Sequence, residues 1–350
     1  MRVVVFGATG NVGTSLVDLL RNDPAVAEVV GVARRRPDAD IAGVSWRQAD
    51  IAGDDLRPVV AGADVVVHLA WLLQPSRDQA EQWRTNVVGT RRVLDAIAAE
   101  EVPALVYASS VGAYSPAPPG MRVTESWPTD GVATSPYSRQ KAYTERQLDA
   151  LEAAHPRTRV VRLRPGLIIK PAAATQIRRL FAGPFAPTAV LRLFGLPIWP
   201  ATRGLNLQFV HTDDVADAYR RAVVNDVHGA FNIAAEPIIT AEQAARALGA
   251  WKVPVPRPLL RGAAALTWHL RLQPADPGWI DLAVNAPLLA TDRARDELGW
   301  SPRHRADDAL AGFIRAVGRG EDAATPPLDA DSSGPARTHE LATGVGGRST

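Results

Sequence analysis

The chain has 350 residues, of which 46% are hydrophobic and 22% are charged, as in an ordinary globular protein with a core. Its formal net charge is +2 and its arginines are spread along the chain, so nucleic-acid binding is not indicated. The absence of cysteine excludes disulfides, thiol catalysis and cysteine-ligated metals. No apolar run reaches the roughly 18 residues that a membrane span needs, and no signal-peptide layout is present. We therefore expect a cytoplasmic protein with neither a metal nor a membrane partner.

A glycine-rich turn stands between a short β-branched strand over residues 2–6 and a helical pattern of apolar residues around 16–20. Its sequence is Gly7-Ala8-Thr9-Gly10-Asn11-Val12-Gly13. Glycines let the backbone approach a pyrophosphate, and the N-terminus of the following helix attracts its charge. The turn therefore predicts a dinucleotide-binding corner. Its spacing is Gly-x-x-Gly-x-x-Gly, and a plain tight turn is the alternative.

The residues after the second predicted strand, 28–33, bear on the choice of cofactor. A Rossmann unit that binds NAD usually carries an acidic residue about 20 positions past the glycines, where it holds the ribose 2′-hydroxyl. Here that count arrives at Ala33, and Arg34, Arg35 and Arg36 follow. Guanidinium groups suit a 2′-phosphate, so NADP(H) is favoured and NAD(H) remains possible. A solvated loop is the alternative reading of these arginines.

Strands and helices alternate through residue 166, which predicts an α/β fold with a doubly wound, Rossmann-type parallel sheet. Strand-like and helical runs farther along, with a helix over 213–224 between them, are expected to return to that sheet. The remaining predicted strands lie at 44–49, 64–69, 104–108, 159–164, 207–210 and 230–233, and the predicted helices include 77–100, 135–155 and one near 258–272.

This pattern divides the chain into a dinucleotide-binding domain and a smaller, mostly helical C-terminal substrate-binding region. The first comprises residues 1–166 and 206–234, and the second comprises 167–205 and 235–317. Residues 318–350 are rich in Pro, Gly, Ser, Asp and Thr and are expected to be a disordered tail.

A tyrosine and a lysine lie four residues apart just inside the predicted helix over 135–155. Ser135 suits the N-cap and Pro136 the first helical position, so Tyr137 and Lys141 share one face. A nearby ammonium lowers the pKa of a phenol, which can then exchange a proton with a substrate oxygen. The alternative is a partly buried tyrosine beside a surface lysine. Lysine is rare in this arginine-rich chain, so its use here favours the functional reading.

Other polar and aromatic residues follow the predicted strands at the carboxyl edge of the sheet, where ligands bind. Ser110 follows the strand over 104–108 and could hydrogen-bond the reacting oxygen, although turn formation is the alternative. His68 is expected to be structural. The apolar run Trp71-Leu72-Leu73 either belongs to the core or walls a binding cleft.

Taken in order, these motifs resemble those of the extended short-chain dehydrogenases/reductases, also called the NAD-dependent epimerase/dehydratase family. The resemblance covers about residues 2–315. The matching motifs are Gly7-x-x-Gly10-x-x-Gly13, Asp50-Ile51, His68-Leu69-Ala70, Asn86-Val87-x-Gly89-Thr90, Ser109-Ser110, Tyr137-x-x-x-Lys141, Arg164-Pro165-Gly166, Phe209-Val210-His211-x-Asp213-Asp214-Val215-Ala216 and Glu297-Leu298-Gly299-Trp300-x-Pro302.

The resemblance implies a role for most of these residues. Ser110, Tyr137 and Lys141 would form a catalytic triad in which Tyr137 exchanges the proton and Lys141 holds the nicotinamide ribose. It also implies a homodimer formed through the helices over 77–100 and 135–155. The implied cofactor-binding set is Gly7, Thr9, Gly10, Asn11, Val12, Gly13, Arg34, Asp50, Ile51, Leu69, Ala70, Asn86, Tyr137, Lys141, Pro165 and Gly166.

Two departures from the family pattern bear on the substrate. Many members that act on nucleotide sugars carry Asn-x-Tyr-Gly-Pro after the sixth strand, where this chain has Leu167-Ile168-Ile169-Lys170-Pro171. They also often carry an Arg-Asp pair before the Phe/Tyr-Val-His segment, where Leu207 and Gln208 stand here. Apolar residues such as Leu167, Ile168 and Leu207 in place of polar anchors disfavour a charged diphosphate, although Lys170 or a loop arginine could still compensate.

Three functions follow as hypotheses. The first is an NADP(H)-dependent carbonyl reductase or alcohol dehydrogenase acting on a mostly apolar small molecule. The second is a nucleotide-sugar epimerase or dehydratase that keeps its nicotinamide cofactor bound. The third is a non-catalytic NADP-binding protein that regulates a partner.

Overall fold

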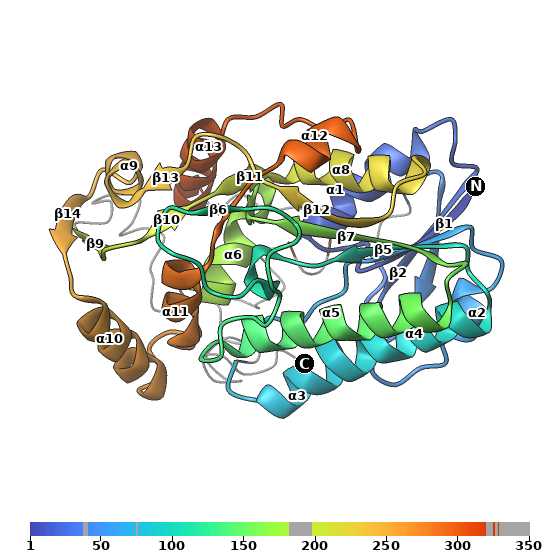
Figure 1. The fold of residues 1–350 in the computed structure, drawn as a ribbon, viewed down its shortest axis with the longest axis horizontal. Coiled ribbons are helices and arrows are strands. Elements are labelled where there is room, and N and C mark those ends of the chain that lie inside the picture. Colours follow the sequence, from blue (N-terminus) through green and yellow to red (C-terminus); the bar gives the residue numbers. More distant parts are fainter. Residues whose placement is uncertain (38–40, 75, 182–197, 320–324, 326–327, 329–350) are drawn as a thin grey trace.

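The computed structural model describes residues 1–37, 41–74, 76–181, 198–319, 325 and 328. Over these residues the expected α/β fold is confirmed by a seven-stranded sheet with the strand order β12-β7-β5-β4-β1-β2-β3 (Figure 1). All neighbouring strands of this sheet are parallel, as in a doubly wound Rossmann-type fold. The strands are β1 (Arg2–Phe6), β2 (Glu28–Ala33), β3 (Val44–Gln48), β4 (Val65–His68), β5 (Ala104–Ala108), β7 (Arg159–Pro165) and β12 (Gly229–Ile233).

The central strands are apolar because both of their faces are covered by helices. In β1, Val3 and Val5 belong to one hydrophobic cluster, whereas Val4 and Phe6 belong to another on the opposite face. The first cluster is closed by α1 (Asn11–Arg21) and α8 (Thr212–Val224), and the second by α4 (Gly89–Ala99) and α5 (Pro136–Ala154). Figure 1 shows these two helical layers above and below the sheet.

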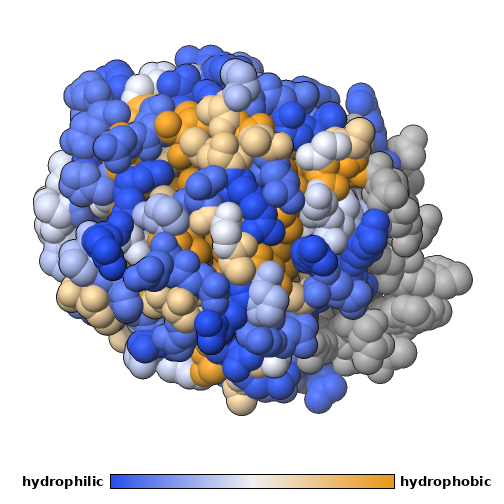
Figure 2. All heavy atoms as spheres, turned by 90° about the vertical axis from the view of Figure 1, so that its right-hand side faces the viewer, coloured by the Kyte–Doolittle hydropathy of each residue, from blue (hydrophilic) through white to orange (hydrophobic). Residues whose placement is uncertain are grey.

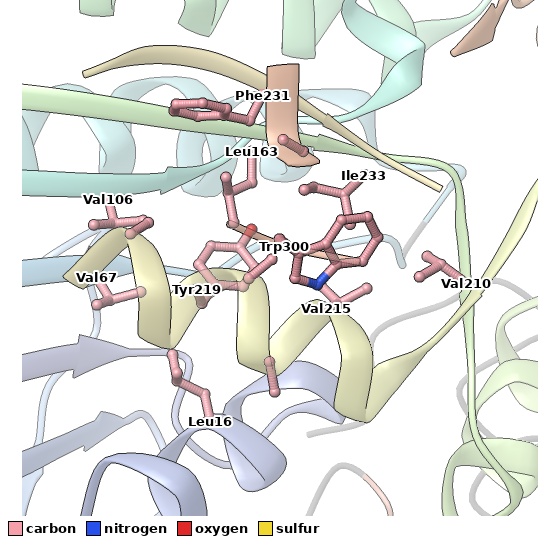
Figure 3. Close-up of a cluster of buried hydrophobic side chains, with 14 of the residues drawn as sticks. Leu16, Val67, Val106, Leu163, Val210, Val215, Tyr219, Phe231, Ile233 and Trp300 are labelled. Atoms are coloured by element: carbon pink, nitrogen blue, oxygen red, sulfur yellow. The ribbon is translucent and has the colours of Figure 1, made fainter. Parts of the chain in front are cut away.

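One core cluster packs residues 294–310 against the sheet (Figure 3). Trp300 is 1% exposed, and its indole donates a hydrogen bond of 2.8 Å to the carbonyl of Asp214 at the start of α8. Tyr219 from the same helix and Phe231 from β12 complete the packing around it. This packing fixes α12 (Asp292–Asp296) and α13 (Ala306–Arg319) against the same face of the sheet as α8.

Elements formed by residues 174–181, 198–207, 239–269 and 278–285 lie on the left of Figure 1, beyond the sheet. This part of the molecule consists of helices and short two-stranded sheets. The strand pairs bring segments that are distant in sequence side by side. The helices are α6 (Ala174–Phe181), α9 (Ala241–Ala247), α10 (Arg257–His269) and α11 (Gly278–Asn285). The paired strands are β8 (Leu167–Ile169) with β11 (Phe209–His211), β9 (Ile198–Ala201) with β14 (Trp251–Pro254), β10 (Asn206–Leu207) with β13 (Ile239–Thr240), and β6 (Arg122–Val123) with β15 (Leu288–Leu289).

Two expectations about elements are corrected. The long helix expected over 77–100 is three consecutive pieces, α3 (Gln79–Trp83), a π-helical turn (Arg84–Val88) and α4. The strand expected over 207–210 does not join the main sheet, because Phe209–His211 pairs with Leu167–Ile169 instead. The predicted disordered tail lies outside the described residues, except for 318, 319, 325 and 328.

Figure 2 views the end of the molecule on the right of Figure 1, where hydrophilic side chains cover most of the surface with apolar ones between them. The chain begins at this end, so the carboxyl edge of the sheet faces the opposite end, toward the C-terminal region. Among the described residues, no helix has the length and apolar character to cross a bilayer.

Candidate active site

The glycine-rich corner begins at the end of β1. Gly7 has φ +81°, a conformation that favours glycine, and its amide donates to the carbonyl of Val32 in β2 at 2.9 Å. A Cβ at position 7 would lie 2.8 Å from the amide nitrogen of Ala70, and a Cβ at position 13 would lie 2.7 Å from the carbonyl carbon of Ala8. These two positions therefore tolerate only glycine, since the chain crosses itself closely there.

Among the described residues, Gly10 is less crowded than Gly7 and Gly13. It is the N-cap of α1 and, lacking a side chain, accepts no hydrogen bond from the N–H groups of the first helical turn. Within the described part of the chain, a Cβ at position 10 would meet the carbonyl oxygen of Gly7 at 3.3 Å. An uncapped helix start bordered by glycines fits a pyrophosphate.

Two distant residues reinforce this corner. The Lys170 ammonium donates to the carbonyl of Asn11 at 2.9 Å and to the hydroxyls of Thr14 and Ser15 at 2.8 and 3.1 Å. The hydroxyl of Thr325 donates to the carbonyl of Thr9 at 2.9 Å. The sequence indicated neither contact, because each joins segments that are far apart along the chain.

The expected adenine and ribose side of the site lies along the ends of β2 and β3. Arg34 follows β2 directly and is exposed. Asp50 accepts a hydrogen bond of 2.9 Å from the amide of Ala52, which shapes the turn after β3. Ile51 is buried, and its side chain lies close to Gly89 at the start of α4, where a Cβ would approach it to 2.9 Å. Ile51 is thus packed by its side chain into the core.

The loop after β4 lies against the glycine corner and is held in place by Asn86. Leu69 donates its amide to the carbonyl of Phe6 at 2.9 Å, and Ala70 is the residue next to Gly7. The buried Asn86 side chain accepts from the amide of Leu72 at 2.6 Å and donates to its carbonyl at 2.8 Å. It also donates to Gln140 on α5 at 2.8 Å. Asn86 therefore fixes the loop to the helix that carries Tyr137.

The three residues expected to form a triad are brought together. Ser135 caps α5 through its side chain, with Pro136 in the first turn, and this sets the start of the helix that carries Tyr137 and Lys141. The ring of Tyr137 packs on Gly112, where a Cβ would lie 2.8 Å from it. Ser110 is 7% exposed and accepts from the amide of Gly112 at 3.0 Å, so its hydroxyl and the Tyr137 ring meet at the same glycine.

The electrostatics of this group differ from the sequence-based expectation. Burial raises the pKa of Tyr137 to about 12, although the Ser110 hydrogen bond acts in the opposite direction. Burial also lowers the pKa of Lys141 well below its ordinary value, although the Glu145 carboxylate opposes this. The expected lowering of the tyrosine pKa by Lys141 is therefore wrong for this structure. The Lys141 nitrogen lies 5.9 Å from the Tyr137 ring centroid and donates instead to the carbonyl of Ala108 at 2.7 Å.

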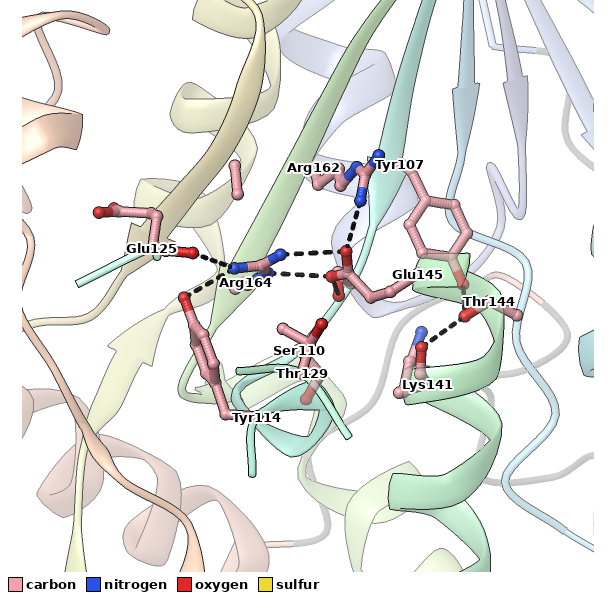
Figure 4. Close-up of polar contacts among 12 residues, drawn as sticks. Tyr107, Ser110, Tyr114, Glu125, Thr129, Lys141, Thr144, Glu145, Arg162 and Arg164 are labelled. Atoms are coloured by element: carbon pink, nitrogen blue, oxygen red, sulfur yellow. Dashed lines mark hydrogen bonds and ion pairs between the residues drawn. The ribbon is translucent and has the colours of Figure 1, made fainter. Parts of the chain in front are cut away.

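Behind α5, a buried ionic cluster surrounds Glu145 (Figure 4). Its carboxylate accepts from Arg164 at 2.9 and 3.0 Å, from Arg162 at 2.9 Å and from the hydroxyl of Ser109 at 2.6 Å. Burial would raise the pKa of Glu145, but the contacts with Arg164, Arg162 and Ser109 outweigh it and hold that pKa at about 2. The cluster fixes the residue before Ser110 to the helix of Tyr137.

In front of α5, aromatic rings gather around Tyr137. Trp71 lies edge-on at 5.9 Å between ring centroids, and Trp279 lies at 4.8 Å with its plane tilted by 32°. Phe181 packs edge-on against Trp279 at 4.9 Å. The contact between Trp71 and Tyr137 supports the interpretation of Trp71 as a wall of the site rather than as part of the core. Trp279 and Phe181 were missed, because no motif or spacing connects them to Tyr137.

The last strand-end residues close the site on the side of β7. Pro165 ends β7, and the amide of Gly166 donates to the carbonyl of Ile233 at 2.9 Å. A Cβ on Gly166 would lie 2.6 Å from the carbonyl oxygen of Gln208. The side chain of Gln208 is itself buried. It accepts a hydrogen bond of 2.6 Å from the amide of Leu289 and donates one of 3.2 Å to the carbonyl of the same residue.

His68 takes the structural role expected of it. It is 1% exposed, and its Nε2 lies 3.0 Å from the hydroxyl of Thr90. Burial, with a contribution from Lys141, lowers the pKa of His68 to about 3, so it stays neutral. Among the described residues, no group of three or more His, Cys, Asp or Glu side chains is placed to hold a metal.

Comparison with known proteins decides the family. A sequence model described as the NAD-dependent epimerase/dehydratase family matches residues 3–234. The chain belongs to this family. The resemblance drawn from its motifs is therefore confirmed. The matched residues include most of the Rossmann-type sheet, the glycine-rich corner and α5.

Relatives of this family member include a 3-diazoavenalumate denitrifying reductase from a Streptomyces species, 32% identical over 321 residues that cover 87% of this chain and 97% of that one. An uncharacterized protein of Mycobacterium tuberculosis is 29% identical over 327 residues, which cover 91% of this chain. This match spans only 30% of the length of that relative, which is a much longer protein. Among solved structures, the UDP-glucose 4-epimerase of Thermus thermophilus in complex with NAD superposes with a TM-score of 0.66 at 24% identity, covering 91% of this chain and 99% of that one. This last likeness concerns the fold.

Proposed function

We propose that this family member is an NADP(H)-dependent oxidoreductase that interconverts a carbonyl and an alcohol on a mostly apolar small molecule. The observation that carries the proposal is the position of the Tyr137 hydroxyl. Tyr137 packs on Gly112 next to Ser110, shares a helix face with Lys141 and lies among aromatic rings.

The residues at the carboxyl edge of the sheet fit a dinucleotide. Gly7, Gly10 and Gly13 would border the pyrophosphate, and the turn at Asp50 and Ile51 would face the adenine. Leu69, Ala70, Pro165 and Gly166 would line the nicotinamide side, and Arg34 would meet a 2′-phosphate. When bound, the nicotinamide supplies the hydride that the carbonyl carbon accepts, or takes it up in the reverse direction.

Tyr137 handles the proton that balances this transfer. In reduction its hydroxyl gives a proton to the carbonyl oxygen, so that C=O becomes CH–OH and solvent reprotonates the phenolate. A pKa near 12 keeps this hydroxyl protonated at neutral pH, which suits it as a donor. Ser110 would orient the same oxygen, and Lys141 would hold the nicotinamide ribose, as the family resemblance implies.

Support for an apolar substrate comes from the replaced anchors and from one relative. Leu167 and Ile168 belong to β8, where nucleotide-sugar members carry polar residues. The side-chain amide of Gln208 is hydrogen-bonded to the backbone of Leu289. Both features favour a reductase over a nucleotide-sugar epimerase or dehydratase. The Streptomyces relative bears the name of a reductase. Retention of Ser110, Tyr137 and Lys141 likewise argues against a non-catalytic regulator.

The test of this function is Tyr137→Phe in an assay of NADPH oxidation across aldehydes, ketones, steroids and sugar nucleotides. Loss of the proton donor should lower kcat/KM by about 10²- to 10⁴-fold while the affinity for NADPH stays unchanged. Activity comparable to the unaltered enzyme would refute the assignment. Titration of the protein with NADP⁺ and NAD⁺ tests the cofactor separately, and a clear preference for NAD⁺ would overturn the role of Arg34.

We also propose that residues 167–205 and 235–317 form the substrate-binding region.

We further propose that the protein is a homodimer through α4 and α5. Support for the dimer comes from Trp83 at the end of α3 and Tyr143 on α5, which are 40% and 49% exposed and whose ring centroids lie 5.0 Å apart. Light scattering with Tyr143→Glu tests this association.

A further inference from the structure

Trp279 is positioned over Tyr137 by contacts that extend well beyond the two rings. Gly278, the first residue of α11, packs so tightly on the start of α5 that a Cβ there would lie 2.6 Å from the carbonyl oxygen of Thr134 and 2.8 Å from the Cα of Ser135. Its amide donates to the carboxylate of Asp276 at 2.8 Å. The start of α11 is thereby fixed to the N-cap of the catalytic helix, and Trp279 is the next residue.

A second anchor lies farther along α11. Asp281 is 2% exposed and pairs with Arg257 at 3.1 Å and Arg261 at 2.8 Å, both from α10. The packing of Gly278 and the polar contacts of Asp281 hold the indole between them in a defined orientation, so the placement of Trp279 is specified by its surroundings.

The wall that contains Trp279 offers π faces and little charge. Among the described residues, Lys141 is the charged side chain recorded against the rings around Tyr137, and its ammonium lies 3.4 Å from the Trp71 ring centroid. The Nε1 of Trp71 is buried and, within the described part of the chain, has no recorded hydrogen-bond partner. A ligand with an acceptor atom would satisfy this donor, since a buried N–H without a partner is costly.

From these contacts we propose that Trp279 determines substrate specificity: its indole stacks on a flat, uncharged aromatic ring that lies next to the reacting carbonyl of the substrate. Aromatic rings that stack with an offset or meet edge-on attract one another beyond simple area burial. An aryl ketone or aldehyde therefore binds better than an aliphatic one of equal size. This inference rests on the proposed reductase function.

A matched pair of ketones tests it, namely acetophenone, whose ring is planar, and cyclohexyl methyl ketone, whose ring is puckered. The unaltered enzyme with NADPH should show a KM about tenfold lower for acetophenone, and KM is the quantity compared because conjugation with the ring lowers the electrophilicity of the aryl carbonyl and so changes kcat. Trp279→Phe keeps a ring and should keep the preference. Trp279→Leu keeps apolar bulk without a π face and should remove it.

Direct binding provides a readout that does not depend on turnover. Calorimetric titration of the NADP⁺-loaded protein with each ketone should give the same order of affinities and the same loss in Trp279→Leu. Trp251→Leu is the matched control and should behave as the unaltered protein. Although Trp251 belongs to the proposed substrate-binding region, it is 79% exposed on β14, at the outer end of that region and away from α5 and α11 (Figure 1). Thermal unfolding of each variant confirms that it is folded.

The outcomes separate the two proposals. No turnover of any carbonyl compound would refute the proposed function and this inference with it. Turnover of both ketones with equal KM values, or a preference that survives in Trp279→Leu, would overturn the role of Trp279 and leave the reductase function standing.

Discussion

The two sides of α5 are built from opposite chemistry. Behind the helix, Glu145 is fully buried in a cluster with Arg162 and Arg164, which are 6% and 5% exposed. In front of it, Trp71 and Trp279 surround Tyr137 with rings. The rear side stabilises charge by pairing it, whereas on the front side aromatic rings contact the phenol.

Lys141 lies where these two environments meet, and this position explains its electrostatics. It stands one helical turn from both Tyr137 and Glu145 on the same helix. Its nitrogen contacts a backbone carbonyl and the face of Trp71, both of which stabilise an ammonium without neutralising it. The difference between the sides therefore gives one helix two environments, with paired charges at the rear and aromatic rings at the front.

The largest expected effect comes from breaking the rear cluster. Glu145→Ala leaves two buried guanidinium groups without their shared carboxylate, which should lower the free energy of unfolding by about 3 to 5 kcal/mol in urea titrations. Glu101→Ala is the control, because Glu101 and Arg157 form a pair that is 79% and 91% exposed. That variant should change stability by less than about 1 kcal/mol. Equal effects in both variants would show that the cluster does not hold α5.

The acid limb of stability gives a second, smaller effect from the same cluster. The pKa of Glu145 is about 2 in the folded protein, below the value of about 4.3 for an unfolded glutamate. Its contribution is therefore fully present above pH 4.3 and is lost as the pH falls through that value toward 2. Glu145→Gln cannot take up this proton, so its stability should decline less steeply between pH 4.5 and 2 than that of the unaltered protein. Parallel declines would contradict this assignment.

The start of α5 is more predictable than the contacts on either side of the helix. Ser135 and Pro136 specify where the helix begins, and short-range spacing then places Tyr137 and Lys141 on one face. The parallel strands were predictable for a similar reason, since β-branched runs bounded by turn residues are local signals. β5, Ala104–Ala108, has the bounds that the sequence predicts.

The front side depends on contacts that no local pattern encodes. Trp279 reaches Tyr137 only because Gly278 packs on Thr134, which belongs to a much earlier part of the chain. The π-helical turn at Arg84–Val88 likewise contains Asn86, whose side chain bonds to Leu72 and Gln140 rather than to its own helix. Spacing within 77–100 could only predict a regular helix, because those bonds form in the folded protein alone.

The smallest expected effect tests whether the front wall sets the acidity of Tyr137. Alcohol oxidation requires Tyr137 to accept a proton, so kcat/KM in that direction should rise by up to about tenfold per pH unit between pH 7 and 10, as the phenolate fraction grows below a pKa of about 12. Because burial is the main cause of that raised pKa, Trp279→Ala admits water and should move it toward the ordinary value near 10. The profile then bends toward a plateau at lower pH in the variant, whatever its KM. Trp251→Leu leaves the wall intact and should reproduce the unaltered profile. If Trp279→Ala also left the profile unchanged, the aromatic wall would select the substrate without tuning the proton donor, and the two tasks of the front side would belong to different residues.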